Sequence, residues 1–86
     1  MDTSFLLLAR YNGLPIIPLH LVQQDFFYHL SLIKFLRKVN EKLIELPIVR
    51  IENSQKSAKG VHIEDLANYL DKRRAIAKRE LDAFYK

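Results

Sequence analysis

Residues 54–62, SQKSAKGVH, form a basic and polar segment between two regions of regular pattern. A β-branched run from Ile48 to Ile51 precedes the segment, and a helical pattern begins near Ile63. The segment holds two lysines, several small hydrogen-bonding residues and no acidic residue. A strand, a basic loop, a short strand and a helix are the elements around the wing of a winged helix-turn-helix. The sequence therefore predicts a wing hairpin over residues 46–62.

A helix-turn-helix is predicted immediately upstream, over residues 18–43. Pro18 suits the first turn of a helix that runs to about Tyr28, and Ser31 is a good N-cap for a second helix that continues to Leu43. The apolar residues of the second helix fall within an arc of about 100° at helical spacing, and its basic residues lie outside that arc. In a recognition helix, such a basic face enters the major groove of DNA. The apolar set is Leu32, Phe35, Leu36, Val39 and Leu43, and the basic set is Lys34, Arg37, Lys38 and Lys42.

Polar and basic side chains suit contacts with the DNA backbone. Arg50 alternates with apolar neighbours and so points away from the core. Ser31 and the N-terminus of the second helix are expected to hold a phosphate, and Gly60 lets the loop turn. The loop donors expected to bind phosphate oxygens are Ser54, Gln55, Lys56, Ser57 and Lys59. Taken alone, the basic face of the second helix could simply be a surface helix with lysines for solubility. Taken alone, the basic loop could simply be a solvated hairpin tip.

The sequence pattern of the N-terminal third predicts short helices and a short strand. Thr3 or Ser4 caps a short helix over Phe5–Tyr11 that Asn12-Gly13 stops, although the same apolar run also fits a strand. Ile16-Ile17 predicts a brief strand. The first helix of the helix-turn-helix then turns apolar side chains inward and leaves polar ones in solvent. The inward set is Leu19, Val22, Phe26 and Phe27, and the solvent set is Gln23, Gln24 and Asp25.

A long helix is predicted from Ile63 to about residue 85. Its apolar residues recur at spacings of three and four, and its first half closes the core through Leu66, Tyr69 and Leu70. The second half extends past what a domain of this size can cover. Its apolar side chains therefore predict a dimer interface with the same helix of a second subunit, with a solvated tail as the alternative. The expected dimerisation residues are Ile76, Leu81, Phe84 and Tyr85.

The composition fits one small domain over residues 1–86. The chain has 86 residues, 49% of them hydrophobic and 28% charged, and no cysteine, which excludes disulfides and cysteine-ligated zinc. Its net charge of +4 is concentrated in residues 31–62, which hold seven basic and three acidic side chains. This distribution is typical of a surface that faces phosphate groups. The apolar run Phe5–Ala9 is too short for a membrane span, so the cytoplasm is the expected location.

The chain carries no recognisable motif for catalysis or for a cofactor. His20, His29 and His62 are scattered and lack the spacing of a metal site, and His62 suits either the entry to a helix or a place in the core. Glycine-rich phosphate loops, nucleophile elbows and zinc-protease motifs are absent. We therefore expect no enzymatic activity, no cofactor and no metal site, but a protein that binds double-stranded DNA.

Several short segments are also shared with one group of bacterial regulators. The most specific are Ser54-Gln55-Lys56, Val61-His62, Asp65-Leu66-Ala67 and Tyr69-Leu70-Asp71. Others are Phe5-Leu6-Leu7 with Ala9 and Tyr11, Ile17-Pro18-Leu19 with Val22 and Phe27, Phe35-Leu36-Arg37-Lys38, and Leu46-Pro47. In these segments the chain resembles the pyocin activator protein (PrtN) family of transcriptional regulators. The resemblance covers nearly the whole chain to about Arg74.

The resemblance implies an activator of bacteriocin or phage-tail-like gene clusters that binds a promoter element. It also implies a layout like that of MerR-type and excisionase winged helices. Together with the patterns above, the expected fold is α+β, mainly α, a small winged helix-turn-helix with a long C-terminal helix. The homodimer is expected from the apolar residues of that helix alone, because the resemblance does not extend to them, and activation is expected to act through RNA polymerase or through DNA distortion. Two alternatives stay open. One is an excisionase-like protein that bends DNA for a recombinase, and the other is a protein-binding adaptor that uses Phe26, Phe27 and the C-terminal apolar stripe.

Overall fold

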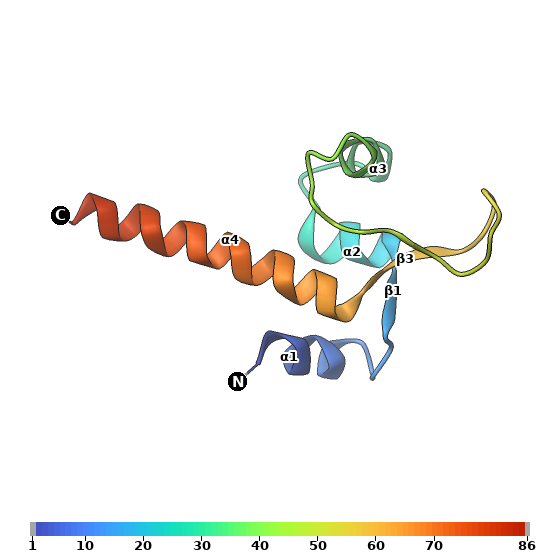
Figure 1. The fold of residues 1–86 in the computed structure, drawn as a ribbon, viewed down its shortest axis with the longest axis horizontal. Helices are drawn as coiled ribbons and strands as arrows, with labels where there is room; N and C mark the ends of the chain where they lie inside the picture. The colour runs from blue at the N-terminus through green and yellow to red at the C-terminus, as the bar shows by residue number, and fades with distance from the viewer. Residues whose placement is uncertain (1, 86) are drawn as a thin grey trace.

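Four helices and a three-stranded antiparallel sheet make up the computed structural model, which describes residues 2–85 (Figure 1). The helices are α1 (Thr3–Arg10), α2 (Leu19–Phe26), α3 (Leu32–Asn40) and α4 (Ile63–Phe84), and the strands are β1 (Ile16–Pro18), β2 (Val49–Arg50) and β3 (Lys59–His62). This is the predicted small α+β fold, mainly helical and with a long C-terminal helix. In Figure 1, α1 lies below α4, α3 lies above α2, and α4 runs out to the left of the other elements.

The sheet joins segments that are far apart in the sequence, in the order β1-β3-β2. Ile17 pairs with Val61, and Val49 pairs with Gly60, both in antiparallel register. β3 is therefore the central strand. The brief strand predicted at Ile16-Ile17 is confirmed, and it forms one edge of the sheet beside β3.

Gly60 lies inside β3 and not in the loop, so its predicted role in the turn is wrong. Its backbone passes so close to β1 that an added Cβ would lie 2.5 Å from the Ile17 carbonyl oxygen and 2.6 Å from Ile16 Cγ2. Any larger side chain would therefore collide with the backbone of the neighbouring strand. Glycine is needed here for the close approach of two strands rather than for a turn.

α1 is a helix, which resolves the choice between helix and strand for the N-terminal apolar run. Its N-cap is Asp2, whose carboxylate accepts a hydrogen bond from the Ser4 N–H at 3.3 Å, so the predicted caps were wrong. The hydroxyls of the first turn instead tie α1 to α4. Thr3 donates to Asp71 at 2.6 Å, and Ser4 donates to Glu64 at 3.2 Å.

α3 ends at Asn40, before the predicted end at Leu43. Lys42 adopts the left-handed conformation with a φ of 63°, and the Leu43 N–H donates to the Lys38 carbonyl oxygen at 2.9 Å. This is a Schellman motif, in which the left-handed position is usually glycine. Leu43 is consequently 67% exposed and does not belong to the apolar stripe in which it was predicted. Asn12, with a φ of 55°, ends α1 in the same way and at the predicted place.

A tight turn connects α2, which ends at Phe26 rather than at Tyr28, to α3. Gln23 lies in α2 and was predicted to face solvent, but its side chain is half-buried. Its amide Nε2 donates to the Leu30 carbonyl oxygen at 2.8 Å. The prediction for Gln23 is therefore wrong, because this side chain supplies a hydrogen bond to the turn between the two helices. Gln24 is exposed, as predicted.

Asp25 links α2 to α1 and was also wrongly predicted to face solvent. Its Oδ2 accepts hydrogen bonds from the Tyr11 hydroxyl and from Arg10 Nη2, the latter at 3.1 Å. Burial, together with the Asp25 carboxylate, raises the pKa of the Tyr11 hydroxyl well above its ordinary value. The phenol therefore stays protonated and keeps donating to Asp25. This cluster fixes the end of α1 against the helix pair.

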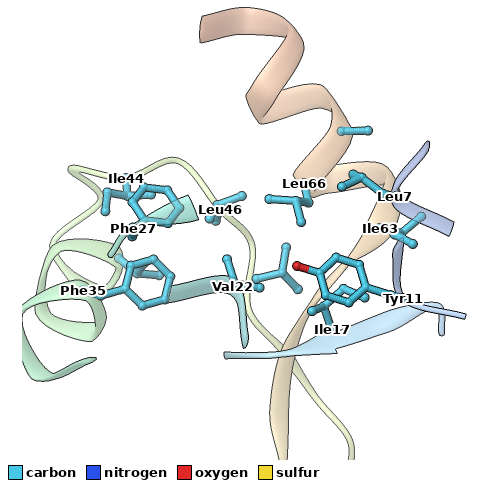
Figure 2. Close-up of a cluster of buried hydrophobic side chains, with 13 residues drawn as sticks. Leu7, Tyr11, Ile17, Val22, Phe27, Phe35, Ile44, Leu46, Ile63 and Leu66 are labelled. Carbon is cyan, nitrogen blue, oxygen red and sulfur yellow. The ribbon is translucent and has the colours of Figure 1, made fainter. Parts of the chain in front are cut away.

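The core forms one continuous band from α3 to α1 (Figure 2). Its largest fully buried side chains are Phe35, Ile17, Leu66, Val22 and Val61. At the α3 end of the band, the centroid of the Phe27 ring lies 4.8 Å from that of Phe35 and 5.7 Å from that of Tyr69. Phe27, at the end of α2, thus packs against both α3 and α4. Because Phe27 is buried, the adaptor surface predicted on Phe26 and Phe27 is wrong at this residue.

Candidate nucleic-acid interface

Two of the residues predicted to contact DNA, Lys34 and Arg37, lie on the outer face of α3. Ser31 is the N-cap, and its hydroxyl oxygen accepts a hydrogen bond from the Lys34 N–H at 3.2 Å, as predicted for the start of this helix. Phe35 and Val39 are buried on the inner side of the helix, while Lys34 and Arg37 are exposed. These four residues lie as the amphipathic spacing predicts, whereas Leu32, which was predicted in the apolar stripe, is 39% exposed at the start of the helix.

Lys38 and Lys42 are less favourably placed than Arg37. Lys38 is half-buried at the side of α3. Lys42 is exposed but follows the end of the helix in the left-handed conformation, so it does not continue the row of Lys34 and Arg37. The structure therefore brings Lys34 and Arg37 together on one face, with Lys38 at the edge of that face.

Three further exposed residues lie on α3 or in the turn before it and were missed by the sequence reasoning. Ile33 and Asn40 are exposed on α3, and Tyr28 is 79% exposed in the turn before it. At about 100° per residue, Ile33 and Asn40 lie within about 60° of Arg37 around the helix axis. Their helical phase places them on the outer face, but neither carries a charge that would mark it as a DNA contact. Tyr28 lies outside both helices and had no periodic signal.

The loop between β2 and β3, residues 51–58, is here called the hairpin loop. Arg50 and Lys59 are paired across the two strands at its base. Arg50 is exposed, whereas Lys59 is half-buried and belongs to β3 rather than to the loop as predicted. Gln55 and Lys56 are exposed in the loop itself. In Figure 1 the hairpin loop and α3 both lie in the upper half of the view, away from α1.

Ser54 and Ser57 shape the hairpin loop by internal hydrogen bonds. Ser57 Oγ accepts from the Glu52 N–H at 2.9 Å and donates to the Ala58 carbonyl oxygen at 2.9 Å. Ser54 Oγ accepts from the Lys56 N–H at 3.2 Å. The phosphate contact of Ser57 stays a prediction. To donate to a phosphate oxygen, the Ser57 hydroxyl would have to give up its hydrogen bond to the Ala58 carbonyl oxygen.

The basic side chains of residues 31–62 have no acidic partners in ion pairs within residues 2–85. The ion pairs in this described range join Arg10 to Asp25 at 3.1 Å and Lys72 to Glu45 at 4.0 Å. Neither pair uses a base of the central segment, which keeps its positive charge available for an anionic ligand. Phosphate groups of a nucleic acid are one class of ligand that such a basic surface attracts.

The second half of α4 leaves the core and extends to the left of all other elements in Figure 1. Leu81, Phe84 and Tyr85 are 56%, 78% and 77% exposed, and Ile76 is half-buried. Five helical turns separate Leu81 from the buried Ile63, so the two residues lie in line on the same face of the helix. Leu81, Phe84 and Tyr85, here called the exposed apolar stripe, therefore continue the face that forms the core in the first half of α4. Ile76 lies about 140° from Leu81 around the helix axis, so its predicted place on the same interface is wrong.

Three further features of residues 2–85 concern other kinds of site. This range contains no group of three or more His, Cys, Asp or Glu side chains that could hold a metal ion. His62 is the N-cap of α4, and its Nδ1 accepts from the Glu64 N–H at 3.0 Å, which confirms its predicted place at a helix entry. Each helix of the described range is too short or too polar to cross a membrane.

The fold and the charge distribution define a small, mainly helical α+β protein with a basic central segment. The model of the family described as pyocin activator protein PrtN matches residues 3–77. The chain therefore belongs to the PrtN pyocin activator family, which indicates a role in transcriptional activation. No curated protein and no solved structure gave a significant match. The family match ends before Leu81, Phe84 and Tyr85.

Proposed function

We propose that this protein is a sequence-specific DNA-binding activator of bacteriocin (pyocin-like) or prophage genes, built as a winged helix-turn-helix. In this proposal α2 and α3 are the helix-turn-helix, α3 enters the major groove of promoter DNA, and the β2–β3 hairpin is the wing. One observation carries the proposal. A strand, a helix pair and a hairpin follow each other in the chain, and the three strands form one sheet. Basic side chains with no ion-pair partner among residues 2–85 lie on the second helix and the hairpin.

The roles of the α3 residues follow from their positions. Arg37, on the outermost part of the helix, can donate two hydrogen bonds to a guanine edge, and Lys34 reaches the adjacent phosphates. The backbone N–H groups after Ser31 offer a phosphate site at the start of the helix. The proposal includes no catalytic step. Activation follows from contact with RNA polymerase or from distortion of the promoter.

The proposal is tested by titrating the purified protein against labelled duplexes tiled from promoters near its own gene. Tight binding to one fragment that weakens steeply between about 50 and about 200 mM salt is the expected result. Equal and weak binding to every fragment would point to an excisionase-like architectural role. Absence of binding at both salt concentrations would contradict the proposal.

The hairpin loop is expected to set part of the salt dependence. Because each phosphate contact contributes about 0.9 to the slope of log affinity against log salt, the double variant Lys56→Ala/Lys59→Ala should lower that slope by about two per protomer. Fluorescence anisotropy measures the slope. The matched control is Lys78→Ala/Arg79→Ala, which removes the same charge from the exposed part of α4. An unchanged slope in the loop variant would contradict a wing on the DNA backbone.

The proposal also includes a homodimer joined through the second half of α4. Leu81→Glu introduces a charge into the exposed apolar stripe, so the mass in solution is expected to fall from twice the 10.1 kDa of one chain to that of a monomer. Light scattering after gel filtration measures the mass. Ala83→Glu is the control, because residue 83 lies on the opposite side of the helix. A wild-type monomer, or a dimer that survives Leu81→Glu, would contradict this interface.

A protein-binding adaptor is the second candidate function, and one feature of α1 favours it. Phe5 and Leu6 are 59% and 52% exposed on the side of this helix that does not pack on α4. Exposed apolar helix faces often mark protein contacts. An adaptor without DNA affinity would retain its protein partner and show no salt-dependent binding to any duplex.

A further inference from the structure

Ile33 is 80% exposed, more than any other large hydrophobic side chain among residues 2–85. It lies in the first turn of α3, directly before Lys34. Isoleucine is β-branched and forms helices less readily than alanine, lysine or glutamate. Isoleucine at this position therefore favours neither helix formation nor solubility. Because the side chain is exposed, packing in the core does not explain it either.

Ile33 shares its face of α3 with Arg37 and Asn40, at spacings of four and seven residues. At 1.5 Å per residue, the three side chains extend over roughly 10 Å along the helix, which corresponds to about three base-pair steps of duplex DNA. All three are exposed, and none is used in packing within the domain. They form a narrow stripe with one apolar, one basic and one amide group.

The neighbours of Ile33 indicate that the occupant of this stripe is duplex DNA rather than a protein. Arg37 and Lys34 lie about 40° and about 100° from Ile33 around the helix axis, and within residues 2–85 neither forms an ion pair. Their charges complement a polyanion. The C5-methyl group of thymine is the apolar group that base pairs present in the major groove, and aliphatic side chains on recognition helices contact it.

We propose that Ile33 is a specificity-determining residue that contacts the C5-methyl group of a thymine in the operator. This inference rests on the proposed function, because it requires α3 to lie in the major groove. Arg37 then reads a guanine, and the Asn40 amide reads an adenine or faces a phosphate, within about three base pairs of that thymine.

The test begins with selection of tight-binding duplexes from a randomised pool by the full-length protein. Each thymine of the selected duplex is then replaced in turn by uracil, which removes only the methyl group. One replacement is expected to weaken wild-type binding about fourfold, the equivalent of one buried methyl group. The Ile33→Ala variant should bind the thymine and uracil duplexes equally, whereas Ile33→Val should keep part of the preference.

Two controls separate this contact from changes in folding. Ile33→Ala should fold at least as well as the wild type, because alanine is the better helix former, and circular dichroism checks this. Leu6→Ala, which truncates an exposed apolar residue of α1, should keep the full preference for thymine. If no duplex is enriched, the proposed function itself fails. If a duplex is enriched but no thymine methyl group depends on Ile33, only the present inference is overturned.

Discussion

Replacing Gly60 with alanine is expected to destabilise the protein by about 3 kcal/mol, the upper part of the range for overpacking. The added Cβ would lie 2.5 Å from the Ile17 carbonyl oxygen, and this atom belongs to the backbone of a strand paired with β3. Relief of the contact requires the two strands to separate. Because a domain of this size has little stability to lose, thermal unfolding followed by circular dichroism should show a large drop in Tm.

Gly13→Ala is the matched control for this prediction. Gly13 has open space around its Cβ position but a φ of 77°, so alanine there meets no atom and is strained only by its backbone conformation. That strain should cost about 1 kcal/mol. If Gly60→Ala unfolded at the same temperature as Gly13→Ala, or at a higher one, the close packing of β1 on β3 would be contradicted.

Arg37→Ala is expected to lower operator affinity roughly tenfold to hundredfold, the range for loss of one bidentate contact with a base. Arg37 is exposed on the outermost part of α3 and forms no ion pair within residues 2–85, so its truncation should leave the fold intact. Lys38→Ala should have a smaller effect, because Lys38 is half-buried at the edge of the same face.

The control for Arg37→Ala is Arg79→Ala, which removes an equal charge from an exposed position of α4. Titration of the selected operator with each variant, at the same salt concentration, gives the comparison. Equal affinities for the two variants would show that α3 contributes only general positive charge. An unchanged affinity for Arg37→Ala would contradict its assignment to the major groove.

Sequence patterns predicted the order of the elements better than their limits. Ser31 was recognised as a helix start because a side chain that can accept from the backbone precedes the apolar pattern, and a helix entry was one of two roles expected for His62. The end of α3 was missed because Lys42 holds a left-handed position that usually needs glycine, so no stop signal was visible. Gly60 was wrongly assigned to a turn, because a glycine is usually a turn signal. Its function is to admit another strand, and strand pairing at a distance leaves no local pattern.

In the candidate site, too, local features could be predicted from the sequence, whereas contacts between distant segments could not. Lys34 and Arg37 could be assigned to an outer helix face because the apolar spacing of their own helix determines which side is buried. Side chains used in contacts between elements could not be assigned in this way. Asp25 looked like a solvent residue, yet it binds Arg10 and Tyr11 from another helix. The sequence likewise gave no sign that the Ser57 hydroxyl bonds within its own loop.

The most direct test of the account is an NMR titration of the isotope-labelled protein with the selected duplex. We expect amide signals of α3 and of the hairpin loop to shift or broaden together, while those of the exposed face of α1 stay in place. Residues 31–40 and 50–59 should form the affected set. Changes confined to α1 and to the end of α4, or no change with any duplex, would contradict the claim that the protein binds DNA through the second helix and the wing.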